Sequence, residues 1–297
     1  MSGSSQFRLL GQRRFAPFFA TQFLGALNDN IFRNGLVILI TFQGVIVAGM
    51  DHTQLANVAA GLFILPYLLF SASAGQLADK YEKSMLIRRV KVMEIVLMML
   101  ATVSLTTESY SLLLLVLFLM GCQSTIFGPV KYAYLPQKLA DDELVGGNAL
   151  VESGTYIAII LGLIVGGIAV ADEIALGFDV TRQTVLGACL ILVALAGYAT
   201  SLQVPKTAAV DPTLRFNWNA WQETWRIISY AREYRSVFLS IIGISWFWFF
   251  GSAMTIQIPA YTLDILNGDE AITTTLLAAF AVGVGIGSLL CERMSGH

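Results

Sequence analysis

Apolar residues in this chain of 297 residues form long, nearly continuous stretches rather than the alternation of a half-buried strand. A helix that crosses a bilayer needs about 20 mostly apolar residues, and about eight stretches reach that length. They run approximately over 16–43, 55–77, 86–106, 110–130, 148–171, 184–204, 237–260 and 271–291. The pattern therefore predicts a chain that crosses a membrane about eight times.

The composition agrees with a membrane protein, since 56% of the residues are hydrophobic and 13% are charged. The first stretch is not a cleaved signal peptide, because it is long and carries Asn28-Asp29-Asn30 in its middle. Cys122, Cys189 and Cys291 fall within or at the edge of apolar stretches without CxxC spacing, so we interpret them as packing residues. No cofactor or metal site is expected.

Lys and Arg collect in alternate links, and this pattern predicts the orientation of the chain. The basic links carry Arg8, Arg13, Arg14, Lys80, Lys83, Arg88, Arg89, Lys91, Lys131, Lys138, Lys206, Arg215, Arg226, Arg232, Arg235 and Arg293. The opposite links carry Asp51, Glu108, Asp172, Glu173, Asp179, Asp264, Asp269 and Glu270, with Arg182 as the single base among them. Because positively charged links stay on the cytoplasmic side, we predict a multi-pass inner-membrane protein with a cytoplasmic N terminus.

Residues 205–236 are the only long polar connection, and they separate six apolar stretches from the last two. We interpret residues 1–204 as an N-terminal six-helix domain and residues 237–297 as the first two helices of a second domain. We expect the chain to be a fragment of a twelve-helix protein, one that binds its substrate poorly and does not complete a transport cycle.

Within this linker, Trp218, Trp221, Trp225 and Ile228 recur at helical spacing with arginines nearby. The spacing predicts an amphipathic helix. Such a helix lies either in the membrane interface or against the protein's own cytoplasmic face, and the sequence favours neither placement.

The link between the second and third stretches reads Gly75-Gln76-Leu77-Ala78-Asp79-Lys80-Tyr81-Glu82-Lys83. It resembles the signature loop of the major facilitator superfamily, although Glu82 stands where glycine is usual. The resemblance implies an all-α polytopic membrane protein with the major facilitator fold, here a six-helix N-domain followed by the first two helices of the C-domain.

The same resemblance implies a gating role for Gly75, Asp79, Lys80 and Lys83, with Asp79 helping to latch the two halves of the transporter together. Physically, Gly75 permits close helix approach, and the cations hold the loop in the aqueous layer. Asp79 can accept from a helix N-terminus or a base.

A narrower resemblance lies in the first stretch, which contains Gln22-Phe23-Leu24-Gly25-Ala26-Leu27-Asn28-Asp29-Asn30-Ile31-Phe32-Arg33-Asn34. This segment is similar to the first helix of bacterial lysophospholipid transporters and their acyltransferase-fused relatives. The segments Phe127-Gly128-Pro129-Val130-Lys131-Tyr132 and Gly287-Ser288-Leu289-Leu290-Cys291-Glu292-Arg293 resemble the same branch. The resemblance implies a flippase that moves lysophospholipid, above all lysophosphatidylethanolamine, by alternating access, with membrane lipids and an acyltransferase domain or protein as partners.

The residues of the first stretch independently suggest a site for substrate or proton coupling. Ionisable groups at membrane depth are costly and normally face inward, paired with one another. Asp29 and Arg33 are four residues apart and share one helical face, so they can partly neutralise each other. Asn28 and Asn30 extend the polar character around the helix. The alternative is a buried ion pair that only fixes helix packing.

Three more ionisable residues approach membrane depth. Glu152 is a site candidate because few nearby bases can satisfy it, whereas Glu94 is better interpreted as a partner of the bases beside it, since Lys91 lies within one turn. Lys131 could meet a phosphate as a point charge, or it could simply extend to the interface.

Two further patterns concern packing. Gly162, Gly166 and Gly167, and likewise Gly283, Gly285 and Gly287, have spacings that let helices approach closely. The aromatic run 246–250 could line a path for an acyl chain, or it could face lipid.

The sequence lacks the motifs of membrane enzymes, the main competing class of protein. The only histidines are His52 and His297, and the sequence contains no HExxH and no GxxxxGK[ST] segment. We therefore predict a protein that is not an enzyme and binds no nucleic acid. The alternative function is a proton-coupled major facilitator carrier for a small metabolite or drug, with Asp29 carrying the proton. A channel or scaffold is a third class.

Overall fold

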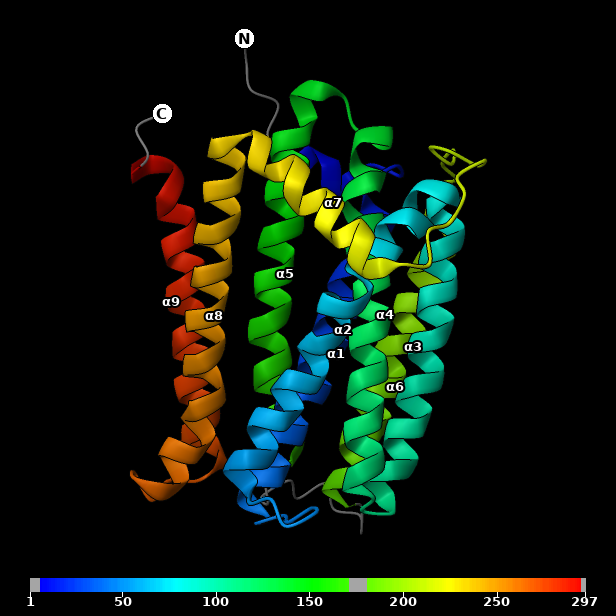
Figure 1. Cartoon of the computed structure of the whole chain (residues 1–297). Helices are drawn as coiled ribbons and strands as arrows, with labels where there is room; N and C mark the ends of the chain where they lie inside the picture. The colour runs from blue at the N-terminus through cyan, green and yellow to red at the C-terminus, as the bar shows by residue number, and fades with distance from the viewer. Residues whose placement is uncertain (1–5, 171–180, 295–297) are drawn as a thin grey trace.

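The computed structural model describes residues 6–170 and 181–294, and the regular elements of this part of the chain are helices (Figure 1). They are the 3₁₀-helix η1 (Gln6–Gly11) and the α-helices α1 (Ala16–Phe42), α2 (His52–Lys80), α3 (Lys83–Thr106), α4 (Tyr110–Lys138), α5 (Asp141–Val170), α6 (Arg182–Ser201), α7 (Ala220–Glu233), α8 (Arg235–Asp264) and α9 (Glu270–Met294).

The predicted apolar stretches all coincide with helices, and the additional helix α7 lies in the predicted linker. Five helices, α2, α4, α5, α6 and α8, are long and apolar enough to cross a membrane. The helices α1 and α3 are comparably long but carry buried polar and charged residues in their middle turns. The prediction of an all-α polytopic membrane protein is confirmed.

Local signals explain several helix boundaries. Asp51 caps α2 by accepting from the Gln54 backbone N–H, and the Gln54 side chain accepts from the Asp51 N–H in return. Pro17 lies in the first turn of α1, where a missing N–H costs nothing. Pro66 lies inside α2, and Gly121 of α4 packs there against the Phe63 carbonyl and the Pro66 ring. The absent side chain of Gly121 thus allows α2 and α4 to approach closely.

The helices α1 to α6 form one packed bundle in which α1 lies between α5 and α6, α2 packs on α4, and α3 packs on α6 and α4. Leu36, Leu117 and Leu190 are fully buried in its main apolar core. A second cluster lies around Phe15 and Phe18, where the Phe18 ring stacks on Tyr134 at 4.4 Å between centroids. Helices α8 and α9 lie side by side at one edge, where α9 packs on α5 (Figure 1).

The links fall at two opposite ends of the bundle. Hydrogen bonds join the start of α1, the end of α4, the α2–α3 link and residues 206–211 at one end, which we call the basic end. The other end holds the residues between α1 and α2 and between α8 and α9, where His52 lies 3.7 Å from Asp264. Asp172, Glu173 and Asp179 of the predicted acidic links lie outside the described residues. The membrane orientation itself stays a prediction.

The linker helix α7 contacts α2 and α8 near the basic end (Figure 1). Its Glu223 is buried, forms an ion pair with Arg226 and accepts from the Asn217 side chain. The side chains of Trp221 and Trp225 point outward and are more than half exposed. The helix thus packs on its own protein and still presents an aromatic side to the surroundings, so the two predicted placements are compatible.

Candidate functional site

A cavity of about 320 Å³, lined mainly by polar and charged residues, lies inside the bundle between α1, α2, α3, α4 and α5. Four of the predicted site residues, Asp29, Asn30, Arg33 and Lys131, line it together. The other lining residues are Gln22, Gly25, Ala26, Phe63, Tyr67, Lys91, Gln123, Ser124, Phe127, Gly128, Tyr132, Thr155 and Ile159. Ionisable groups inside a membrane bundle normally mark a substrate or ion path, so this cavity is the candidate site.

Asp29 lies in the middle of α1 and faces α4 across the cavity. The Ser124 hydroxyl donates to Asp29 Oδ2 at 2.6 Å. The other carboxylate oxygen, Asp29 Oδ1, is buried and has no hydrogen-bond partner among the described residues. A buried carboxylate oxygen without a donor is costly, and a ligand with an N–H or O–H group would satisfy it.

Arg33 lies one turn further along α1. Its guanidinium donates to Asn30 Oδ1 at 2.8 Å and stands over the Phe63 ring at 5.6 Å from the centroid. The expected neutralisation of Arg33 by Asp29 is not seen as an ion pair, because none within 4.0 Å joins these two described residues. The rotamer that reaches Asn30 turns the guanidinium from Asp29 toward α2. Arg33 therefore has an amide oxygen as its partner and no carboxylate.

Asn28 is fully buried and points away from the cavity, toward α3. Its side-chain amide donates to Glu94 Oε1 at 2.9 Å, while Lys91 Nζ donates to Glu94 Oε2 at 2.6 Å. Lys91 and Glu94 are each 1% exposed, and Gln123 of α4 adds a donor to Glu94 Oε2 at 3.3 Å. The interpretation of Glu94 as the partner of Lys91 is confirmed, and Asn28 belongs to the shell of this pair.

Sequence reasoning missed Lys91 as a site residue, although it borders the cavity. The signal was its spacing of three from Glu94 in an otherwise apolar segment, which places both side chains on one helical face. The sequence did not show how the neighbouring helix α1 leaves space for the Lys91 side chain. A Cβ on Gly25 of α1 would lie 2.5 Å from Lys91 Nζ, so glycine at this position admits the ammonium group.

Glu152 of α5 does not line the cavity but borders it through Lys131. Lys131 Nζ lies 3.2 Å from Glu152 Oε1, and the Tyr132 hydroxyl donates to the same oxygen at 2.6 Å. The expectation that few nearby bases can satisfy Glu152 is therefore wrong in the folded protein, because the end of α4 brings Lys131 and Tyr132 to α5. Lys131 is mostly buried and paired, so it does not simply extend into the interface.

The α2–α3 link differs from its predicted role in two respects. A Cβ on Gly75 would meet nothing within 4 Å, so this glycine does not mark a close helix contact. Lys83 is fully buried rather than in the aqueous layer, and its ammonium donates to the Ala208 carbonyl at 3.3 Å. The linker covers Lys83 in this structure, a long-range contact that the motif alone did not reveal. Lys80 stands over the Tyr81 ring at 6.0 Å.

Glu82, the departure from the usual glycine, has a structural role. It caps α3 by accepting from the backbone N–H groups of Ser84 and Met85, and it also accepts from the Thr207 N–H at 2.8 Å. Burial alone would raise the pKa of Glu82, but these N–H donors outweigh burial and hold the pKa below its ordinary value.

Asp79 holds the linker through its backbone. Its carbonyl accepts from the Val210 and Asp211 N–H groups, both at 3.0 Å. Together with Glu82 and Lys83, this carbonyl attaches residues 207–211 along the predicted gating motif. We call this set of contacts the linker clasp.

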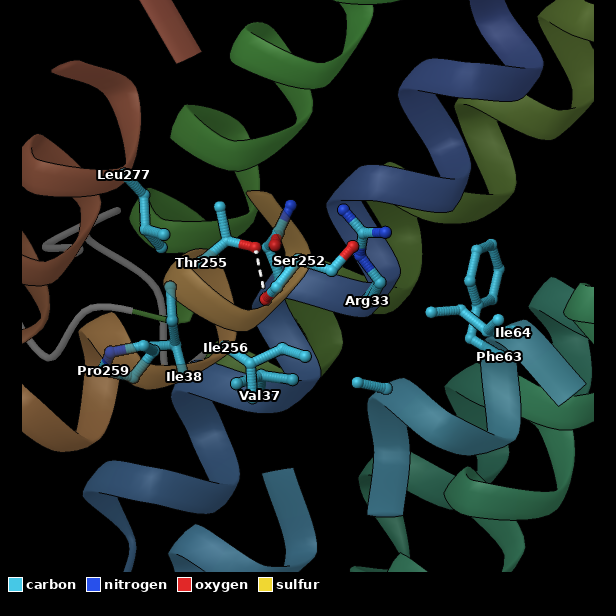
Figure 2. Close-up of a pocket in the computed structure, with 12 residues that line it drawn as sticks. Arg33, Val37, Ile38, Phe63, Ile64, Ser252, Thr255, Ile256, Pro259 and Leu277 are labelled. Carbon is cyan, nitrogen blue, oxygen red and sulfur yellow. Dashed lines mark hydrogen bonds between the residues drawn. The ribbon is translucent and has the colours of Figure 1, made fainter. Parts of the chain in front are cut away.

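A second, smaller cavity of about 60 Å³ lies where α1 and α2 meet α8 and α9 (Figure 2). Figure 2 shows apolar side chains around it, among them Val37, Ile64 and Ile256, with Arg33 at its border. Arg33 lines both cavities, so a charged group lies between a space lined mainly by polar residues and one lined mainly by apolar residues.

The glycine predictions hold for α5, whereas in α9 the prediction is wrong for Gly283 and is not tested for Gly285 and Gly287. A Cβ on Gly162 would lie 2.6 Å from Asn30 Cβ, one on Gly166 would lie 2.7 Å from the Ile31 carbonyl oxygen, and one on Gly167 would collide with Thr274. A Cβ on Gly283 would meet nothing within 4 Å, whereas the surroundings of Gly285 and Gly287 lie outside the described side chains.

The aromatic run 246–250 of α8 lies on an exposed face and lines neither cavity. The Trp248 ring stacks parallel to Tyr156 of α5 at 6.3 Å between centroids. This placement favours the lipid-facing alternative over an internal acyl-chain path.

A helical membrane bundle with ionisable side chains around an internal cavity is typical of secondary transporters. Residues 17–297 match the sequence model of the Major Facilitator Superfamily, so the chain belongs to that superfamily. The major facilitator fold predicted from the α2–α3 link is thereby confirmed.

Among individual proteins, the chain is similar to the lysophospholipid transporter LplT of Escherichia fergusonii, with 26% identity over 283 residues, 90% of this chain and 62% of the relative. It is 28% identical over 278 residues to LplT of Enterobacter sp. (strain 638), covering 91% of this chain and 63% of the relative. It is also 28% identical over 277 residues to LplT of Citrobacter koseri, covering 91% of this chain and 63% of the relative. The resemblance to this branch is confirmed, and the chain spans roughly three fifths of the length of these relatives.

Proposed function

We propose that this protein is a secondary transporter that moves lysophospholipid, in particular lysophosphatidylethanolamine, across the bacterial inner membrane by alternating access. The observation that carries the proposal is the position of Arg33 between a cavity lined mainly by polar residues and one lined mainly by apolar residues. A lysophospholipid has a charged head and a single acyl chain. The charged residues of the larger cavity suit the head, and the apolar side chains of the smaller cavity suit the start of the acyl chain. The similarity to relatives named lysophospholipid transporter supports the same class of substrate.

The head group of lysophosphatidylethanolamine carries a phosphate and an ammonium group, and the cavity offers a partner for each. Lys91 and Lys131 are already paired with Glu94 and Glu152, so Arg33 is the cavity cation without a carboxylate partner and the better phosphate ligand. Asp29 Oδ1 has no hydrogen-bond donor among the described residues, and the negative charge of this carboxylate is complementary to an ammonium group.

The proposed organisation follows the sequence interpretation. Residues 1–204 form the six-helix domain, residues 205–236 the cytoplasmic linker and residues 237–297 the start of a second transporter domain. The basic end faces the cytoplasm, because the Lys- and Arg-rich links gather there. Gly75, Asp79, Lys80 and Lys83 belong to the gating region. The protein acts as a carrier and not as an enzyme, and an acyltransferase would consume the lysophospholipid that it delivers.

The test is uptake of labelled lysophosphatidylethanolamine into spheroplasts that lack their own transporter, together with binding of the same lipid to the purified protein. Both are measured on the full-length transporter, because the chain alone, which spans roughly three fifths of its relatives, is expected to bind poorly and not to complete a transport cycle. Asp29→Asn is expected to lower binding at least about tenfold, since it removes the charge that faces the ammonium group. Binding of lysophosphatidylglycerol, which lacks an ammonium group, should be weakened less by the same substitution.

Asp51→Asn is the matched control, because asparagine caps a helix as well as aspartate and the position lies far from the cavity. It should leave binding and uptake unchanged. Transport that depends on a pH gradient but is indifferent to lysophospholipid would reject the proposal in favour of the proton-coupled carrier for a small metabolite or drug.

A further inference from the structure

A third cavity, of about 590 Å³, opens at the basic end and shares no residue with the two cavities of the proposed transport site. It lies where η1 leads into α1, beside the first turns of α3 and the end of α6. Its lining consists of Arg13, Arg14, Arg88, Leu202, Gln203, Val204, Pro205 and Lys206. The lining thus contains four cations and no carboxylate.

Two of these cations are neutralised and held in place. Arg14 forms an ion pair with Glu143 at 2.5 Å and also donates to Gln12 Oε1 and to the Lys138 carbonyl. Arg88 donates to the Ser84 carbonyl and hydroxyl, and lies 4.0 Å from Glu82. Both guanidinium groups are therefore fixed before any ligand arrives, which lowers the cost of binding.

The other two cations have no such partners. The side chains of Arg13 and Lys206 make no hydrogen bond or ion pair with any described residue. The backbone of Lys206 is nevertheless fixed, because its carbonyl accepts from Lys138 Nζ at 2.7 Å. The cavity thus carries about two uncompensated positive charges on an ordered frame, which favours an anionic ligand.

The remaining lining is apolar and lies at the end of a membrane span. Helix α6 ends at Ser201, and the exposed Leu202 with Val204 and Pro205 continues its apolar surface to the cations. At this level a bilayer presents phosphate groups directly above aliphatic chains. Basic pockets between helices at the cytoplasmic side are known to suit anionic lipid head groups.

We propose that this cavity, the Arg13–Lys206 pocket, binds the phosphate head group of an anionic phospholipid of the surrounding bilayer. The bound lipid is not the transported molecule, since the pocket is separate from the proposed transport cavity. Its phosphate meets Arg13 and Lys206, while its glycerol and the start of its acyl chains lie against Leu202 and Pro205.

The experiment measures binding of phosphatidylglycerol to the purified chain in detergent by native mass spectrometry, with phosphatidylethanolamine and inorganic phosphate as comparison ligands. The double variant Arg13→Gln/Lys206→Gln removes the two unpartnered cations. It should bind phosphatidylglycerol at least about tenfold more weakly and lose the preference over phosphatidylethanolamine.

The matched control is Arg8→Gln/Arg89→Gln, which removes the same charge from two exposed residues outside the lining. It should stay within about twofold of the parent, as should Arg13→Lys/Lys206→Arg, which keeps the charge. An equal loss in the control, or retained binding in the pocket variant, would overturn the proposal. Binding of inorganic phosphate without any preference for phosphatidylglycerol would overturn it as well.

Discussion

The bundle helices α2, α4, α5 and α6 and the edge helix α8 have similar hydropathy but differ in how they pack. The most apolar segment of α8 has a mean hydropathy of 1.7, against 1.8 to 2.1 for α2, α4, α5 and α6. A third or more of the corresponding residues in those four helices are buried, whereas none of those in α8 is. Apolar composition therefore predicts that a helix enters the membrane, but not which neighbour covers it.

The difference lies in glycine and in buried polar groups. Gly162 and Gly166 place α5 directly on the backbone of α1, and Glu94 ties α3 to both α1 and α4. Along α8, a Cβ on Gly243 would meet nothing within 4 Å. Within a membrane, close backbone approach and interhelical hydrogen bonds supply much of the packing energy, and α8 has little of either in the described structure.

The largest effect is expected from the buried pair of the six-helix bundle. Lys91→Met leaves Glu94 buried without its cation, which should lower the free energy of unfolding by about 3–5 kcal/mol. Thermal unfolding in detergent measures the loss. The double variant Lys91→Met/Glu94→Gln should recover much of it.

The counterpart at the end of α8 is the pair of His52 with Asp264, whose carboxylate is half exposed. Asp264→Asn should cost less than about 1 kcal/mol. A similar cost for Lys91→Met and Asp264→Asn would contradict the contrast between the two regions.

Adding a methyl group at matched glycines tests close packing. Gly162→Ala forces a Cβ against Asn30 and should destabilise the protein by about 1–3 kcal/mol. Gly243→Ala has open space and should be neutral, or stabilising by up to about 1 kcal/mol through helix propensity. Urea or SDS unfolding measures the free energy of unfolding of both variants. Equal destabilisation by the two substitutions would contradict the prediction.

The linker clasp should respond to pH through Glu82. Its folded-state pKa is lower than the unfolded value of about 4.3, so its contribution is fully present at pH 7 and is lost as the pH falls through the folded-state pKa. Glu82→Gln should cost about 1 kcal/mol at pH 7, as for loss of a helix cap. The gap in melting temperature between parent and variant should narrow as the pH falls below the unfolded-state pKa and close once the pH is below the folded-state pKa. A gap that stays constant with pH would show that the charge is not involved.

The smallest effect is expected on the exposed face of α8. Phe249→Leu should change the free energy of unfolding by no more than about 0.5 kcal/mol, because the residue is 66% exposed and its ring contacts Trp246, which is itself exposed. Phe18→Leu is the matched change at a fully buried ring and should cost about 1 kcal/mol or more. A melting scan of both variants distinguishes them.

Features that depend on local sequence were predictable, and features that depend on distant partners were not. The helices followed from apolar stretches, and the convergence of Asp29 and Arg33 on one cavity followed from their spacing. The partner of Arg33 depended on its rotamer. The donors to Glu152 come from the end of α4, and the cover on Lys83 comes from a linker more than a hundred residues away. Hydrophobic periodicity carries no information about such pairings.

The linker clasp has a consequence for how this segment tolerates change. Between residues 208 and 211 it is attached through peptide groups, since Lys83 binds the Ala208 carbonyl and the Asp79 carbonyl accepts from the Val210 and Asp211 amides. The Ala209 side chain takes no part in these contacts, so a label attached at position 209 should leave the path of the backbone unchanged. Substitution of Val210 or Asp211 by proline should break the attachment, because proline lacks the amide hydrogen that donates to the Asp79 carbonyl.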